Sequence, residues 1–146
     1  METIQFAQSD IEIENCFEVM QVLRPHLLKE NFVQQIREME QEGYRLLYVA
    51  IEENKNNRVV AVAGYRNMHM LYCGKIIYID DLCTLPACRG KGYAGRLLDY
   101  IHQLAKDTGK SGVHLDSGYQ RNNAHRLYLS KGYVLACHHF SNMWNS

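Results

Sequence analysis

The segment of residues 76–98, IIYIDDLCTLPACRGKGYAGRLL, most constrains what this chain can fold into. It begins as a β-rich run and ends with apolar residues at helical spacing, and between them Gly90 and Gly92 permit a tight turn. A strand that enters a helix through such a turn presents unpaired backbone N–H groups at the positive end of the helix dipole. Because Arg89, Lys91 and Arg96 add positive charge to the turn and the start of the helix, the segment indicates a site for a phosphate or pyrophosphate.

The periodicity of the remaining sequence predicts a mixed α/β fold. An antiparallel meander is expected first, with a hairpin loop over residues 52–57, followed by a β-α-β unit. The expected order is β-α-α-β-β-β-α-β-α-β. The strands are predicted over residues 3–7, 44–51, 58–65, 75–85, 112–116 and 132–140, and the helices over residues 10–27, 32–39, 92–108 and 124–130.

Length and charge narrow the classes of protein further. A chain of 146 residues that is 47% hydrophobic and 22% charged suits one globular domain, expected over residues 1–146. Sixteen basic residues balance sixteen acidic ones, which argues against binding nucleic acid through bulk charge. The balance is uneven, however: residues 1–42 hold nine acids and three bases (−6), and residues 43–146 hold seven acids and thirteen bases (+6). Chance partition between solvated surfaces is the simplest reading of this asymmetry.

Other features predict the cellular setting. Residues 1–10 lack the basic and then apolar pattern of a signal peptide, and no run approaches the length of a membrane span. The five cysteines are scattered and form no C-x-x-C motif, so reduced thiols in the cytoplasm are expected. The adjacent histidines His138 and His139 would point to opposite faces of a strand, so no metal site is predicted.

Two other phosphate-binding motifs compete for the glycine-rich turn. The spacing of a P-loop is absent. Gly90, Gly92 and Gly95 do match the dinucleotide fingerprint G-x-G-x-x-G, and Asp116 follows about 20 residues later. Two aspartates lie inside the preceding strand, however, and a central parallel strand is normally an apolar run. A nicotinamide dinucleotide enzyme is therefore kept as a rival hypothesis only.

A third reading rests on resemblance to a known family. Residues 89–94, RGKGYA, fit the signature Q/R-x-x-G-x-G/A of the GNAT superfamily of N-acetyltransferases. Residues 80–86, DDLCTLP, resemble the acidic fourth strand and loop of that family, and residues 124–133, AHRLYLSKGY, resemble its last helix and the strand that follows. The likeness covers nearly the whole chain and implies a GNAT-like fold, with a mixed, mostly antiparallel central sheet and helices on both faces.

The resemblance implies acetyl-CoA as acetyl donor, with its pantetheine arm inserted between splayed fourth and fifth strands. A backbone N–H near Cys83 would polarise the thioester carbonyl. The family's usual cofactor-binding Asn position is occupied by Arg121, so Asn122, Asn123 or Arg121 itself could take that role. The residues expected to hold the cofactor are Leu82, Cys83, Thr84, Arg89, Gly90, Lys91, Gly92, Tyr93, Ala94, Gly95 and Asn122.

Three residues are candidates for the chemistry. Tyr128 matches the family tyrosine that protonates the leaving thiolate; the alternative is a packed core aromatic. Asp80 matches a position where some members carry a glutamate base, and Asp81 is its neighbour. Consecutive strand residues point to opposite faces, so only one of the two is expected to face the substrate unless a bulge intervenes. Carboxylates that serve the structure alone are the equal alternative.

The resulting prediction is an N-acetyltransferase that moves the acetyl group directly to a primary amine, without an acyl-enzyme. The family builds its acceptor side partly from the first two helices, so the acidic residues 1–42 favour a small cationic acceptor. A protein or peptide amine is the alternative acceptor, and a non-catalytic acyl-CoA-binding module is the alternative function. No nucleic acid or membrane partner is expected, and a homodimer fits the family.

Overall fold

The computed structural model describes residues 2–144 of the chain, which divides into two compact units, Met1–Leu115 and Asp116–Ser146. The first unit is built on a five-stranded sheet in the order β1-β2-β3-β4-β5. All pairs are antiparallel except β4 and β5, which are parallel. The strands are β1 (Glu2–Phe6), β2 (Arg45–Glu53), β3 (Asn56–Met70), β4 (Gly74–Thr84) and β5 (Gly112–Leu115).

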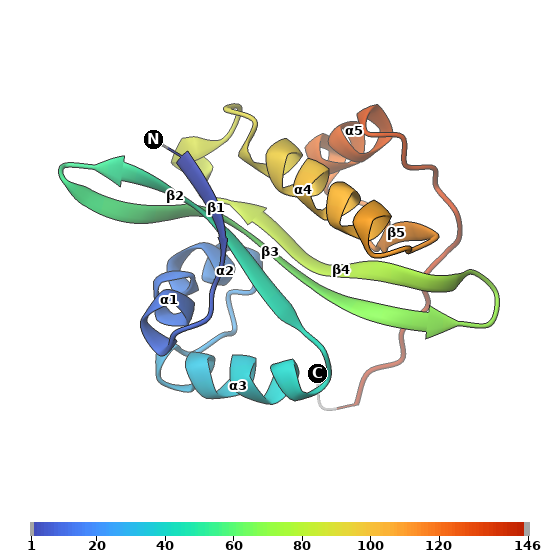
Figure 1. Cartoon of the computed structure of the whole chain (residues 1–146), viewed down its shortest axis with the longest axis horizontal. Helices are drawn as coiled ribbons and strands as arrows, with labels where there is room; N and C mark the ends of the chain where they lie inside the picture. Colours follow the sequence, from blue (N-terminus) through green and yellow to red (C-terminus); the bar gives the residue numbers. More distant parts are fainter. Residues whose placement is uncertain (1, 145–146) are drawn as a thin grey trace. The chain divides into compact units, whose positions relative to one another are not determined.

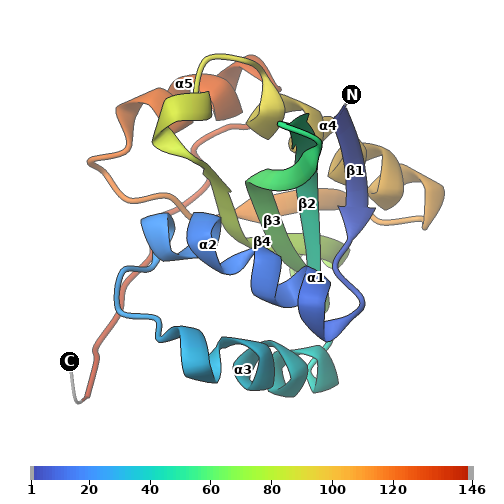
Figure 2. The ribbon, with the colours of Figure 1, turned by 90° about the vertical axis from the view of Figure 1, so that its left-hand side faces the viewer.

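Helices cover both faces of this sheet, which confirms the predicted mixed α/β class. The three early helices lie on one face and α4 lies on the other (Figures 1 and 2). The second unit contains α5. The helices are α1 (Asp10–Asn15), α2 (Phe17–Leu23), α3 (Lys29–Gln41), the single-turn 3₁₀ helix η1 (Pro86–Cys88), α4 (Tyr93–Asp107) and α5 (Asn122–Ser130). None of the helices in the described chain is long and apolar enough to span a membrane.

The β2–β3 hairpin closes within the predicted loop but more tightly than expected. Glu53 pairs with Asn56, which leaves Asn54 and Lys55 as the two turn residues, with φ angles of 51° and 66°. Two successive residues of positive φ give a turn whose twist matches that of the flanking strands. Both strands are therefore longer than the sequence predicts.

The first predicted helix is two helices, because it breaks at Cys16. The backbone N–H of Cys16 bonds the carbonyl of Ile13, so α1 ends after six residues before α2 begins. The second helix ends at Leu23, because Pro25 disfavours the helical conformation of the residue before it. Arg24 accordingly leaves the helix, with φ of −123° and ψ of 77°.

The closing strand predicted over residues 132–140 is not observed. Within residues 2–144 the structure describes no strand after β5, and most side chains from Tyr133 onward are exposed. A strand needs a partner for its backbone groups as well as β-forming residues. The sequence pattern of this segment shows β-forming residues, but it does not show whether a neighbouring strand pairs with them.

One buried contact ties β3 and β4 to the segment that precedes β2. Gly64 on β3 pairs with Asp81 on β4, and the Tyr44 hydroxyl donates a 2.8 Å hydrogen bond to the Asp81 carboxylate. A Cβ atom at Gly64 would overlap the Tyr44 hydroxyl. Glycine is therefore required at position 64 for the hydroxyl to reach the carboxylate.

We predict that Gly64→Ala lowers the free energy of unfolding by about 1–3 kcal/mol, the usual cost of overpacking a core. Gly112→Ala is the matched control in the same sheet, since a Cβ there meets nothing closer than 3.9 Å. Urea denaturation measures both. Equal stability of Gly64→Ala and the unsubstituted chain would show that Tyr44 can move aside without cost.

Candidate active site

The strands β4 and β5 separate in the middle of β4. Their parallel pairing begins at Ile76 with Gly112 and ends at Ile79 with Leu115, whereas β4 itself continues to Thr84. No strand of the described chain pairs with residues 80–84 on that side. The second half of β4 therefore has an open edge on the side of β5.

Hydrogen-bond alternation along β4 decides which residues face this open edge. The N–H of Leu85 donates to Val60 on β3, and alternate residues of an antiparallel ladder bond the same neighbour. Cys83 therefore directs its backbone groups toward β3, and Leu82 and Thr84 direct theirs to the open edge. The Cys83 side chain is buried, in keeping with a small core residue.

A β-bulge lies where the two strands part. Gly64 pairs with Asp81 but Tyr65 pairs with Ile79, so Asp80 is the extra residue of β4. The strict alternation of strand side chains fails at such a position. As a result, both aspartates join one charged cluster instead of pointing to opposite faces. We call this the bulge cluster; its members are Arg24, Tyr44, Arg66, Asp80 and Asp81.

The Asp81 carboxylate is held at both oxygens. Arg24 donates from Nε to Oδ1 at 3.0 Å, and its Nη2 lies 2.9 Å from the same oxygen, while the Tyr44 hydroxyl donates to Oδ2. The Asp81 side chain is 11% exposed. Burial, with the nearby Asp81 charge, raises the pKa of Tyr44 well above its usual value, so this hydroxyl keeps its proton.

Asp80 is bound separately, by Arg66. The guanidinium donates from Nη2 to Oδ2 at 2.6 Å and from Nε at 3.1 Å, a charge-assisted pair that raises the pKa of Arg66. The Asp80 carbonyl accepts a further 2.9 Å hydrogen bond from Nη2 of Arg24. Both carboxylates are therefore engaged in ion pairs within the bulge cluster.

The glycine-rich turn has the tight backbone conformation that the sequence predicts. Gly90 and Gly92 have φ angles of 81° and 84°, and α4 begins directly after Gly92 without a side-chain cap. The N-cap residue Gly92 has no side chain to accept from the first N–H groups of α4, which point out of the helix start. The Arg89 and Lys91 side chains, on the same turn, are exposed.

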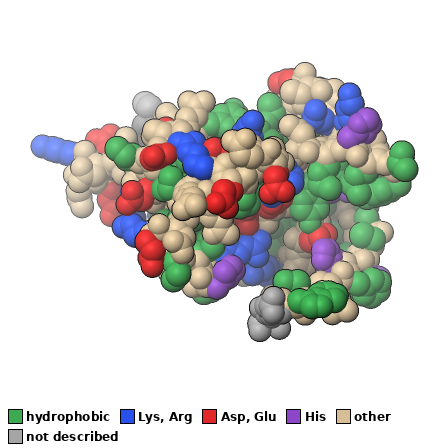
Figure 3. Space-filling model, turned by 90° about the horizontal axis from the view of Figure 1, so that it is seen from below, with side chains coloured by type: hydrophobic (Ala, Val, Ile, Leu, Met, Phe, Trp, Pro, Cys, Tyr) green, Lys and Arg blue, Asp and Glu red, His purple; other side chains and the backbone are tan. Residues whose placement is uncertain are grey.

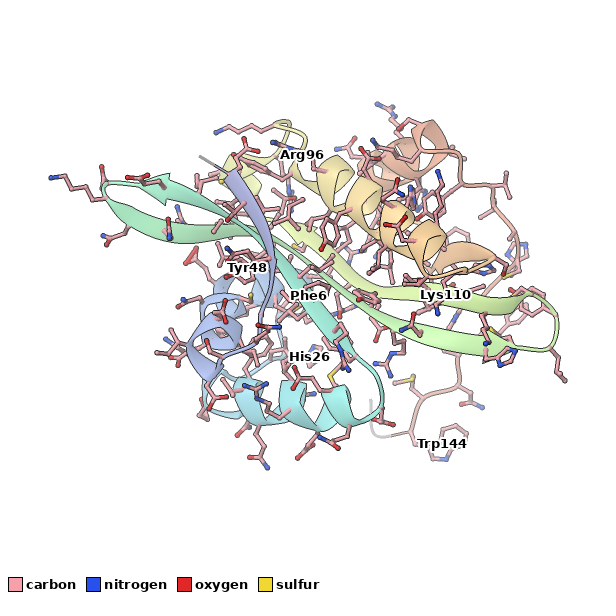
Figure 4. All side chains as sticks on the ribbon, viewed as in Figure 1. Phe6, His26, Tyr48, Arg96, Lys110 and Trp144 are labelled. Carbon is pink, nitrogen blue, oxygen red and sulfur yellow. The ribbon has the colours of Figure 1, made fainter. Side chains whose placement is uncertain are left out.

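Residues of the first turn of α4 pack against the glycine-rich turn and bond to it. Tyr93 is buried, and Ala94 and Gly95 are partly buried. Arg96 turns back over the Tyr93 ring, 4.9 Å from its centroid, and donates to the Lys91 carbonyl at 2.9 Å. Figure 4 shows Arg96 beside the beginning of α4.

Arg96 also pairs with Glu2 of β1. The basic residues of the turn predicted one charged surface toward the phosphates, but this guanidinium binds protein groups. The sequence spacing is consistent with the contacts of Arg96 to the turn, since Arg96 lies four residues after Gly92. Its Nε also contacts the Gly92 carbonyl at 3.4 Å. The ion pair to Glu2 depends on tertiary structure and has no signal in the sequence.

The two remaining candidates belong to the second unit. Tyr128 lies on α5, and its ring packs edge-on against Tyr133 at 5.8 Å between centroids. Burial raises the pKa of Tyr128, so its hydroxyl keeps its proton at neutral pH. Asn122 is the first residue of α5 and is exposed, next to Arg121 at the N-cap.

Comparison with known proteins agrees with these features. Residues 12–133 match the family model described as the acetyltransferase (GNAT) family. The uncharacterized N-acetyltransferase YhdJ of Bacillus subtilis is 34% identical over 115 residues, 79% of each chain. The aminoalkylphosphonate N-acetyltransferase of Salmonella typhimurium is 30% identical over 80 residues, which cover 54% of this chain and 52% of that enzyme.

Solved structures share the fold at low sequence identity. A transcriptional regulator from Bacillus halodurans superposes with a TM-score of 0.83 at 18% identity, over 99% of this chain and all of the other. The aminoglycoside N-acetyltransferase AAC(6')-Iy, bound to a CoA bisubstrate analogue, has a TM-score of 0.82 at 11% identity, over 100% and 99% of the two chains. On the family match across most of its length, this chain belongs to the GNAT family of acetyltransferases.

Proposed function

We propose that this protein transfers the acetyl group of acetyl-CoA to the primary amine of a small molecule. The observation that carries the proposal is the open edge of β4 followed, eight residues later, by an uncapped helix start with two glycines of positive φ. The open strand edge suits the extended pantetheine arm of CoA, with its amide groups, and the helix start suits the pyrophosphate. The two features follow one another in the chain as the two groups do in CoA. The N-acetyltransferase relatives support the same activity.

The residues present fit the donor. The backbone groups of Leu82 and Thr84 would bind the amides of the pantetheine arm, which would lie along the edge of β4 like an additional strand. The N–H groups that follow Gly92 would bind the pyrophosphate, with Arg89 and Lys91 adding charge. The family resemblance implies that Cys83 contributes backbone groups as well, but the alternation of the β3–β4 ladder favours its two neighbours.

Once the amine is neutral, the reaction needs two proton transfers. The amine nitrogen attacks the thioester carbonyl and forms the new C–N bond, and the C–S bond then breaks to release a thiolate. In our proposal Tyr128 gives that thiolate its proton, since its hydroxyl is protonated at neutral pH and it matches the family tyrosine of that role. The amide nitrogen loses its extra proton to a base.

The choice of base follows from the bulge cluster. An alkylamine of pKa near 10.4 is protonated in solution, so it must lose a proton before it attacks. Both carboxylates accept hydrogen bonds at both oxygens, Asp81 from Arg24 and Tyr44 and Asp80 from Arg66. The Asp80 side chain is the more exposed of the two, at 20% against 11%, so we propose Asp80 as the proton acceptor through water, while Asp81 fixes the bulge.

Two classes of acceptor follow from the charges. The acidic residues 1–42 favour a cationic amine, yet many of these carboxylates are bound by the protein's own bases. On the face seen in Figure 3, acidic and basic side chains are interspersed. The pairs are Glu2 with Arg96, Asp10 and Glu40 with Arg37, Glu14 with Lys29, and Glu18 with Arg58.

An amine with an anionic group is the second class. Arg24 and Arg66 of the bulge cluster have side chains 41% and 25% exposed, and a guanidinium is well suited to a phosphonate or carboxylate. The relative that acetylates aminoalkylphosphonates supports this class.

Four further points stay predictions: a protein or peptide amine as acceptor, a non-catalytic acyl-CoA-binding role, a cytoplasmic location and a homodimer.

The test is turnover with a panel of amines. The protein is incubated with acetyl-CoA and equal concentrations of a polyamine, an aminoalkylphosphonate or a basic peptide, and release of free CoA thiol is followed. We expect acetylated product, identified by mass spectrometry, from one of the two small amines. CoA binding without turnover would support the non-catalytic module, and thermal stabilisation by NAD instead of CoA would support the dinucleotide rival.

We predict that Tyr128→Phe lowers kcat by about 10²-fold, the lower range for loss of a general acid, and leaves the Kd for CoA unchanged. Tyr133→Phe removes the hydroxyl of the neighbouring ring and is the matched control, expected to retain kcat. Steady-state kinetics and calorimetric titration measure the two quantities. An unchanged kcat for Tyr128→Phe would assign this tyrosine to packing.

We also predict that Gly92→Ala weakens CoA binding by about tenfold, since an l-residue there costs roughly 1–2 kcal/mol in the left-handed region and displaces the turn. Gly109→Ala, at the other end of α4, is the control, because Gly109 has a similar φ of 71° and open space around it. Both variants should lose similar stability. If both variants lost CoA affinity to a similar extent, the loss would be due to general destabilisation and not to a change at the phosphate site.

A further inference from the structure

The bulge of β4 determines where the proposed cofactor slot opens. The register of β3 with β4 shifts at Asp80, immediately after the last β4–β5 pair at Ile79 and Leu115. A bulge bends its strand and increases the local twist. Leu82 and Thr84 follow within four residues, so the position of the bulge sets the position of the groups offered to the pantetheine arm.

A bulge also leaves a backbone group without its ladder partner. Here the carbonyl of Asp80 accepts from Nη2 of Arg24 at 2.9 Å, a bond from outside the sheet. A buried or partly buried carbonyl without a donor is costly, so this bond stabilises the bulged conformation over a regular strand. The same guanidinium donates to the Asp81 side chain through Nε.

The position of Arg24 is itself fixed by packing. Phe17, Val19 and Met20 of α2 are buried, and the N–H of Arg24 bonds the Met20 carbonyl at 2.9 Å as the helix ends. Pro25 prevents the helix from continuing. The guanidinium therefore reaches the sheet from a helix end that is anchored in the core.

We propose that Arg24 is a positioning residue of the cofactor slot, which clamps the two bulge residues of β4 at the Asp80 carbonyl and the Asp81 carboxylate. It acts through β4 and does not contact the cofactor. The inference rests on the proposed function, because it assigns the residue to the slot in which acetyl-CoA would bind. Because Arg24 directly follows α2, the same contacts also connect the end of this helix to β4.

The fork of arginine is the property that the clamp requires. Nε and Nη2 point to two acceptors at once, the Asp81 carboxylate and the Asp80 carbonyl. Lysine has one nitrogen and cannot hold both in the same geometry. Arg24→Lys should therefore keep the charge balance of the bulge cluster but loosen the bulge.

The experiment compares CoA affinity with stability in three variants. Arg24→Lys keeps the charge, whereas the double variant Arg24→Met with Asp81→Asn removes both charges, so that no buried carboxylate is left unpaired. Arg58→Gln is the matched control, since Arg58 forms a 2.7 Å ion pair with Glu18 on the surface and is similarly exposed, at 45%. Calorimetry with free CoA gives Kd well below each Tm, and steady-state kinetics give KM for acetyl-CoA.

We expect the Kd for CoA to rise about tenfold in the double variant and by less in Arg24→Lys, because displaced binding groups lose affinity even when the fold persists. Arg58→Gln should keep the affinity of the unsubstituted chain. A lower Tm with Kd within twofold in Arg24→Lys would overturn the proposal, and so would unchanged Tm and Kd. If the unsubstituted chain itself fails to bind CoA, the proposed function fails instead.

Discussion

The arrangement of the first unit depends on the pairing of one buried carboxylate. Asp81 is the only charged residue buried within residues 2–144, and a charge withdrawn from water must be matched by donors. Arg24 supplies one donor from the end of α2, and Tyr44 supplies the other from the segment before β2. Gly64 leaves the space that the tyrosine needs. These contacts fix the bulge, and the bulge marks the point at which β4 parts from β5.

The open edge where β4 separates from β5 and the turn before α4 are suited to two different kinds of ligand group. An open strand edge offers alternating donors and acceptors to an extended chain of amides, with little charge. The turn offers converging N–H groups at a helix start, next to Arg89 and Lys91, which suit a compact anion. CoA contains both chemistries in sequence, joined over a short distance. This match is the physical reason for the proposed function, and the family assignment is independent support for it.

Local sequence patterns predicted the elements well where local physics decides them. The glycine turn, the stripe of α4 and the meander are encoded by neighbouring residues, and the structure agrees with each of them. The bulge cluster could not be predicted in the same way, because Arg24 and Tyr44 lie 57 and 37 residues from Asp81. The missing strand over residues 132–140 has a similar origin, since a strand depends on a partner for its backbone groups.

The most direct test of the account is backbone amide exchange at β4 with and without CoA, followed by NMR. The account predicts that the amides of Leu82 and Thr84 and those that follow Gly92 exchange more slowly when CoA is added. The amide of Cys83 should change little, because its N–H already faces β3. Protection confined to other strands, or equal protection of Cys83 and its two neighbours, would contradict the claim that the open edge of β4 is the cofactor slot.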